Sequence, residues 1–237
     1  MDALGFGAPV YWLLGHSYIV LIDWAKEVAH WPGAVVRMPS MSRIAYGLLI
    51  GGGLWLCLWH SRLRMVAIVP IIVGIALAVS AQPPDILVSA DGRQVALRID
   101  GNRLARLHAR QAGFVTTSWI TASAATGSVR LSTLPGARCS ASGCALSMVT
   151  KGRTTIVLVA RAAHPPQPAK LEAACRAVDI VISERPLPPD CQPRRLRIDR
   201  VSLQKTQALA IWLSPARMQT VAGQIGDHPW QPAPSAP

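Results

Sequence analysis

The sequence predicts a membrane α-helical hairpin joined to a soluble α+β domain, and composition and charge distribution are the first signs of it. The 237 residues are 51% apolar and 15% charged, whereas soluble domains carry roughly 25% charged residues and disordered chains are poor in apolar ones. The formal net charge of +12 is unevenly distributed. Residues 1–81 hold five basic and three acidic residues, and residues 82–237 hold the remaining nineteen and nine. We therefore expect two units, one in contact with lipid and one with water. The composition of the whole chain excludes a wholly disordered protein and an ordinary cytosolic enzyme.

The segment 1–43 is expected to hold an amphipathic helix and a connecting segment. Within 17–31, four polar side chains recur at spacings of three and four, which places them on one face of a helix: Asp23, Lys26, Glu27 and His30. This pattern is typical of a helix lying in the membrane interface. The alternative is that it packs against membrane helices outside this chain. Pro32 and Gly33 are expected to end the helix.

The segment 44–81 is expected to form a transmembrane helical hairpin. Residues 44–59 and 65–81 contain no charge, and each run is near the lower end of the roughly 17–25 residues that span a bilayer. Gly51, Gly52 and Gly53 would allow the two helices to approach closely. The alternative is a buried hairpin in a soluble protein. Arg62 and Arg64 lie between the runs, so the positive-inside rule places this loop in the cytoplasm and residues 82–237 in the periplasm.

The segment 82–228 is expected to be the α+β domain, followed by a disordered tail at 229–237. A helix is expected at 168–177. Asp91-Gly92 and Asp100–Asn102 are typical turn sequences. Short strands are expected at 86–89, 95–99, 103–108, 129–131, 145–149, 154–160, 178–183, 196–199, 208–213 and 219–222.

Four of the five cysteines lie in this domain. Four cysteines allow three pairings, and we expect the local one, Cys139–Cys144 with Cys175–Cys191, because the expected compartment is oxidising. The alternative is buried free thiols. A zinc site is disfavoured because no CxxC motif or nearby histidine pair completes a tetrahedral ligand set.

Six segments occur in a characteristic order along nearly the whole chain: 1–9 (MDALGFGAP), 31–36 (WPGAVV), 52–59 (GGLWLCLW), 83–93 (PPDILVSADGR), 175–183 (CRAVDIVIS) and 226–230 (GDHPW). Their order resembles the C-terminal third of ComEC-type competence proteins of the alphaproteobacterial type. The resemblance implies an inner-membrane channel that takes up single-stranded DNA in natural transformation. It also implies a C-terminal domain related to metallo-β-lactamases. Because the family's full-length members are much longer, the resemblance implies that this chain is a fragment or split product that needs further ComEC-like membrane segments or competence proteins as partners.

Many members of that family carry an HxHxDH metal-nuclease motif, in which two metals activate water. The six histidines here are isolated, and Asp227-His228 is the nearest histidine–aspartate pair. The chain also lacks GxSxG, Walker and GxGxxG motifs. We therefore expect a degenerate metallo-β-lactamase-like domain with no catalytic residues, no metal and no cofactor.

Two groups of arginines are the candidate DNA contacts, because guanidinium groups neutralise phosphates independently of base sequence. They are Arg93, Arg98, Arg103, Arg106 and Arg110, and Arg194, Arg195, Arg197 and Arg200. Strand alternation would place Arg195 and Arg197 on one face. Trp119 and Trp212 are candidates for base stacking or for core packing. The alternative for the arginines is solvation or contact with anionic lipid headgroups.

The leading hypothesis is a fragment of an inner-membrane channel for single-stranded DNA, with a non-catalytic basic domain in the periplasm and the lipid bilayer as its other partner. The runner-up is a membrane-anchored envelope protein whose disulfide-braced periplasmic domain binds another protein. Salt-sensitive DNA binding distinguishes the two.

Overall fold

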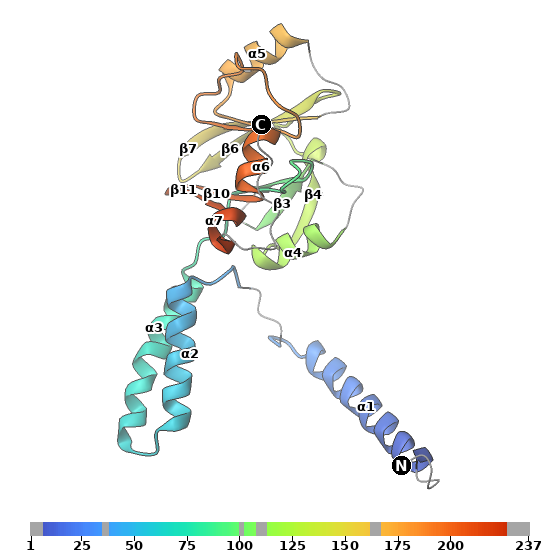
Figure 1. Ribbon diagram of the computed structural model, residues 1–237, viewed down its shortest axis with the longest axis vertical. Helices are drawn as coiled ribbons and strands as arrows, with labels where there is room; N and C mark the ends of the chain where they lie inside the picture. Colours follow the sequence, from blue (N-terminus) through green and yellow to red (C-terminus); the bar gives the residue numbers. More distant parts are fainter. Residues whose placement is uncertain (1–6, 35–37, 100–101, 108–112, 162–166, 227–237) are drawn as a thin grey trace. The chain divides into compact units, whose positions relative to one another are not determined.

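A computed structural model describes residues 7–34, 38–99, 102–107, 113–161 and 167–226 (Figure 1). The chain divides into two compact units, residues 1–37 and 38–237. The expected tail at 229–237 lies outside the described residues, as does most of the expected turn at 100–102.

Within its described residues, 7–34, the first unit contains the helix α1, Gly7–His30, none of whose residues is buried. It begins ten residues before the expected start, because the apolar run ahead of Ser17 continues the helix. Pro9 does not interrupt it, since a first-turn residue has no helical hydrogen bond to lose. The helix ends just before Gly33, which has a φ of +88°.

The second unit starts with two packed helices, as the hairpin prediction requires. α2 is Arg43–Leu58, and its first turn is capped by Ser42, whose hydroxyl accepts a hydrogen bond from the Ala45 amide at 3.2 Å. A 3₁₀ turn, Arg62–Ala67, leads into α3, Ile68–Val79. Of the helices described, Arg62–Val79 is long and apolar enough to cross a membrane by length and composition, and α2 is apolar but shorter.

Small residues allow α2 and α3 to pack closely. A Cβ on Gly52 would lie 2.7 Å from Ile71 Cγ1, and one on Gly74 would lie 2.9 Å from Leu49 Cγ. Gly51 and Gly53 have nothing within 4 Å of a Cβ position, so Gly52 alone of the three glycines serves the contact. Ala45, Ala67 and Ala78 are buried, while most of the large apolar side chains of the two helices are exposed.

The domain that follows contains two β-sheets. The six-stranded sheet has the order β11-β10-β1-β2-β3-β4 and is antiparallel except between β3 and β4. Its strands are β1 Ile86–Val88, β2 Val95–Ile99, β3 Arg103–Arg106, β4 Gly127–Arg130, β10 Leu209–Leu213 and β11 Ala216–Thr220.

The five-stranded sheet has the order β5-β6-β7-β8-β9. β5 to β7 are antiparallel, and β7, β8 and β9 run parallel. Its strands are β5 Arg138–Ser140, β6 Gly143–Thr150, β7 Arg153–Ala160, β8 Ile180–Ser183 and β9 Leu196–Ile198.

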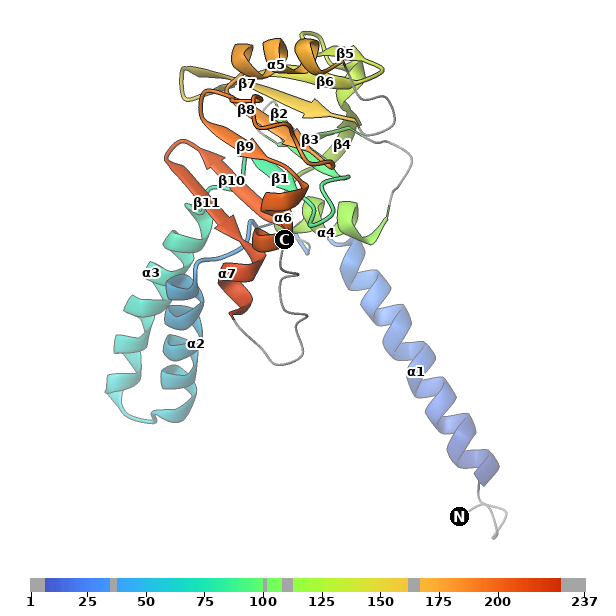
Figure 2. The same ribbon diagram turned by 45° about the horizontal axis from the view of Figure 1, so that its top comes forward.

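The two sheets pack face to face, and each carries a helix on its outer face (Figure 2). The shared core between the sheets includes Leu97, Val157, Ile182 and Ile211. α4, Phe114–Ala122, covers the six-stranded sheet through Trp119 and Ile120. α5, Pro168–Ala177, covers the five-stranded sheet through Leu171 and Cys175, among others. The domain is thus a mixed α/β structure in four layers.

Four α-helices lie in the described part of this domain, whereas the sequence predicted only the one at 168–177. α6 is Arg200–Thr206 and α7 is Val221–Ile225. The strand expected at 219–222 is wrong in part, because β11 ends at Thr220 and α7 follows it. The Thr220 hydroxyl accepts from the Gly223 amide at 3.0 Å and thereby caps α7.

Candidate functional site

A cavity of about 420 Å³ collects arginines from both groups that the sequence singled out. It is lined by the turn that follows β1, by the residues directly after β8 and by α6. The lining residues are Ala90, Asp91, Arg93, Glu184, Arg185, Arg200 and Gln204. The carboxyl end of a parallel strand such as β8 is where ligands bind in many α/β proteins.

Gly92 brings these three segments together. Its φ of +70° lies in the region that favours glycine, and a Cβ there would lie 2.9 Å from Leu203 Cδ1 and 3.0 Å from Glu184 Cα. The β1–β2 turn therefore lies directly against both the end of β8 and α6. Asp91 stabilises the turn by accepting a hydrogen bond from the Arg93 amide at 3.1 Å and another from the Ser89 hydroxyl.

The charged groups of the cavity differ in their partners. Arg93 Nε lies 3.5 Å from Glu184 Oε2, and Asp91 is engaged by its own turn. Arg185 and Arg200 are exposed, and neither forms an ion pair with a carboxylate of the described residues. Two guanidinium groups are therefore available to a ligand, and planar guanidinium groups bind phosphate oxygens through paired hydrogen bonds.

The other arginines of the first group lie elsewhere. Arg98 donates to the Pro84 carbonyl at 3.1 Å and the Ser123 carbonyl at 2.8 Å. Burial lowers the pKa of Arg98, and Asp85 opposes that shift. Arg106 Nη1 donates to the Thr116 hydroxyl at 2.8 Å, so both side chains fasten α4 and its neighbouring loop to the sheet. Arg103 is exposed at the start of β3, and Arg110 lies outside the described residues.

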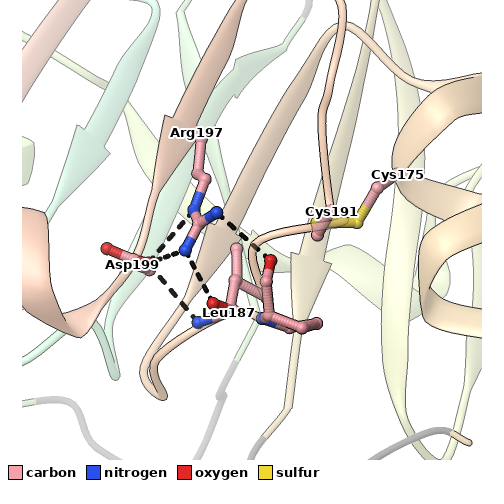
Figure 3. Close-up of a disulfide and its surroundings, with 6 residues drawn as sticks. Cys175, Leu187, Cys191, Arg197 and Asp199 are labelled. Carbon is pink, nitrogen blue, oxygen red and sulfur yellow. Dashed lines mark hydrogen bonds and ion pairs between the residues drawn. A yellow bond between two sulfur atoms is a disulfide. The ribbon is translucent and has the colours of Figure 1, made fainter. Parts of the chain in front are cut away.

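The guanidinium group of Arg197 makes hydrogen bonds within the domain (Figure 3). It donates to Asp199 Oδ2 at 2.8 Å, to the Leu187 carbonyl at 2.6 Å and to the Pro188 carbonyl at 3.2 Å. Burial alone raises the pKa of Asp199, but hydrogen bonds from the Ser202 amide, Arg197 and the Leu187 amide outweigh it and lower that pKa.

Arg194 and Arg195, the remaining members of the second group, are exposed. Arg195 Nε lies 4.0 Å from Asp179 Oδ1, which makes a weak surface pair. The structure thus brings Arg93 and Arg200 together in the cavity and leaves the other candidates outside it. Arg185 was missed by sequence reasoning, although its place immediately after a buried strand was a usable signal.

Both expected disulfides are present. Cys139 and Cys144 face each other across the β5–β6 pair, with Cα atoms 4.0 Å apart. Cys175 at the end of α5 is bonded to Cys191 in the loop before β9, with Cα atoms 5.3 Å apart. The second bond fixes the loop whose carbonyls receive Arg197 (Figure 3). The disulfides therefore brace the five-stranded sheet, whose strand β8 ends at the cavity.

The two tryptophans considered for base stacking are packed instead. Trp119 packs against the outer face of the six-stranded sheet. Trp212 is 6% exposed, and its indole Nε1 donates to the Gln82 carbonyl at 2.8 Å.

Within the described ranges, no three histidine, cysteine or acidic side chains gather as a metal site would require. His108, His164 and His228 lie outside those ranges. Comparison with known families, with curated proteins and with solved structures gives no match for this chain.

Proposed function

We propose that this chain is a membrane-anchored component of single-stranded DNA uptake, which binds the DNA backbone and does not cleave it. The observation that carries the proposal is the pair of arginines in the cavity, Arg185 and Arg200, to which no carboxylate of the described residues is paired. Their chemistry suits phosphodiester oxygens, and a backbone contact of this kind needs no base sequence.

The membrane role is supported by the hairpin. α2 and α3 bury small residues against each other and turn large apolar side chains outward, as membrane helices do. Contiguous apolar surface on this scale is rare on soluble monomers. We infer that the hairpin spans the bacterial inner membrane with its 3₁₀ turn, which carries Arg62 and Arg64, in the cytoplasm.

The periplasmic position of the domain is supported by its disulfides. Both pairs are closed in the structure, and such bonds persist in oxidising compartments. The four-layer arrangement of helix, sheet, sheet and helix supports the degenerate metallo-β-lactamase-like assignment. Together with the resemblance to ComEC-type proteins, these features favour a passive guide for incoming DNA.

The test is DNA binding by the full chain in nanodiscs of zwitterionic lipid, measured by fluorescence anisotropy with a labelled oligothymidylate at several salt concentrations. We expect affinity to fall with salt, and R185Q/R200Q to lower the slope of log K against log salt by about 1.4, or roughly 0.7 per lost phosphate contact. The matched control is R130Q/R153Q, which removes the same charge at exposed positions outside the cavity.

Two outcomes contradict the proposal. Equal effects of the two double variants would show that net charge, and not the cavity, binds DNA. No binding at low salt by a folded and inserted chain would remove the DNA role and favour a protein ligand for the domain.

A further inference from the structure

A second cavity, of about 440 Å³, lies where the helical hairpin joins the domain. We propose that it binds the phosphate headgroup of an anionic phospholipid. The proposal rests on the membrane insertion of the hairpin proposed above. From the hairpin side, the lining includes Arg43 at the start of α2 and Leu77 in the last turn of α3. From the domain side, it includes Trp212 and Arg217 of β10 and β11.

The cavity is positively charged. Arg43 and Arg217 line it, and none of its described lining residues is acidic. Neither guanidinium is within ion-pair distance of a carboxylate in the described part of the chain. Two basic groups from distant parts of the sequence that line one cavity, together with amide and hydroxyl side chains, suit a phosphate.

The domain holds Arg217 in place before any ligand arrives. The Arg217 guanidinium lies 4.1 Å from the centroid of the Trp212 ring, a cation–π arrangement. Trp212 is itself buried and is fixed by its hydrogen bond to the Gln82 carbonyl at 2.8 Å. Because Gln82 directly follows the hairpin, this contact ties the arginine to the point where the chain leaves the membrane.

The position of the cavity along the hairpin favours a lipid over other sources of phosphate. Ile44, directly after Arg43, is 70% exposed, and Val79, two residues after Leu77, is 67% exposed. The exposed apolar surface of α2 and α3 therefore begins next to the residues that line the cavity. Headgroup phosphates lie immediately outside the hydrocarbon layer, so they meet this cavity at the depth of its two arginines.

The test uses the full chain in nanodiscs made of equal parts phosphatidylglycerol and phosphatidylcholine, released into the gas phase for native mass spectrometry. We expect the chain to retain phosphatidylglycerol in preference to phosphatidylcholine. The double variant R43Q/R217Q should reduce that preference about thirtyfold, since each basic residue near anionic lipid contributes roughly a factor of five. R43K/R217K keeps both charges and should retain most of the preference, which separates a lost site from a misfolded chain.

The matched control is R62Q/R64Q, which removes two basic residues from the opposite end of the hairpin, outside the cavity. An equal loss in this control would overturn the proposal, because scattered basic residues would then explain the preference. Displacement of the lipid by inorganic phosphate, or by oligothymidylate, would also overturn it and assign the cavity to soluble phosphate or to DNA. Flotation of the chain with vesicles is measured in parallel. A chain that does not float contradicts membrane insertion itself, whereas one that floats without a lipid preference contradicts only the cavity.

Discussion

At the scale of single residues, Asp199 connects the stability of the domain to the candidate DNA site. One of its carboxylate oxygens accepts from Arg197 at 2.8 Å, and the other accepts from the Ser202 amide at 3.0 Å and so caps α6. The next residue in the chain, Arg200, lines the arginine cavity. By capping α6, Asp199 therefore positions the guanidinium group of Arg200 in the cavity.

We expect Asp199→Asn to destabilise the domain by about 3 kcal/mol at neutral pH, because it leaves the half-buried Arg197 without its counter-charge. The folded-state pKa of Asp199 is lowered, so its stabilising contribution is present above the unfolded pKa of about 3.9 and is lost as pH falls through the folded pKa. Urea unfolding of the full chain in detergent should show wild type and variant converging below about pH 4.

The control for this prediction is Asp190→Asn, at an exposed position outside the arginine network. It should change the free energy of unfolding by less than about 0.5 kcal/mol. A difference between wild type and Asp199→Asn that stays constant down to low pH would show that the carboxylate charge is not what stabilises the site.

At the scale of elements, the local signals predicted β2 and α5 with their observed bounds and β1 and β7 to within one residue. α4 was not predicted because Phe114–Ala122 is rich in β-branched and aromatic residues, which intrinsically favour strands. It is helical because Trp119 and Ile120 cover the outer face of a sheet, a tertiary effect that local propensity does not contain. α6 was missed although Asp199 and Ser202 form a recognisable capping box.

The candidate site was predictable only in part, for a related reason. Arg93 and Arg200 were identified as basic, but they are more than a hundred residues apart. Their meeting depends on sheet packing and on the close approach at Gly92. The sequence also gave no indication that Arg98 and Arg197 would be used for internal hydrogen bonds, because those partners are mostly backbone carbonyls.

The packing of α2 on α3 predicts that alanine substitutions at Gly52 and Gly53 have different effects on stability. Gly52→Ala should lower the thermal stability of the hairpin in detergent, since its Cβ would lie 2.7 Å from Ile71 Cγ1 and 3.2 Å from the Ala67 carbonyl oxygen. Gly53→Ala meets nothing within 4 Å and should be neutral or stabilising by up to about 1 kcal/mol, because alanine favours helix. Circular dichroism melts of both variants provide the comparison. Equal behaviour of the two would mean that the helices do not pack through Gly52.

At the scale of the whole molecule, the apolar excess and the positive charge belong to different parts of the chain. The apolar surface is carried by α1, α2 and α3, and most of the basic excess follows residue 81. The two disulfides lie in the five-stranded sheet and its neighbouring segments. This division supports the proposed membrane attachment, in which the bilayer would be the solvent of the apolar helices and water the solvent of the basic domain.

The length of the helical hairpin predicts how the proposed membrane anchoring depends on bilayer thickness. α2 has 16 residues and α3 has 12, which at about 1.5 Å per residue gives roughly 24 and 18 Å. Both are shorter than a hydrocarbon layer of about 30 Å, so a bilayer spanned as proposed would thin around them at a cost of a fraction of a kcal/mol per Å. Thermal stability in vesicles should therefore be highest in dimyristoyl-, lower in dioleoyl- and lowest in dierucoyl-phosphatidylcholine. A chain whose stability is the same in all three lipids, or which remains in the aqueous fraction on flotation, does not hold its hairpin across the bilayer.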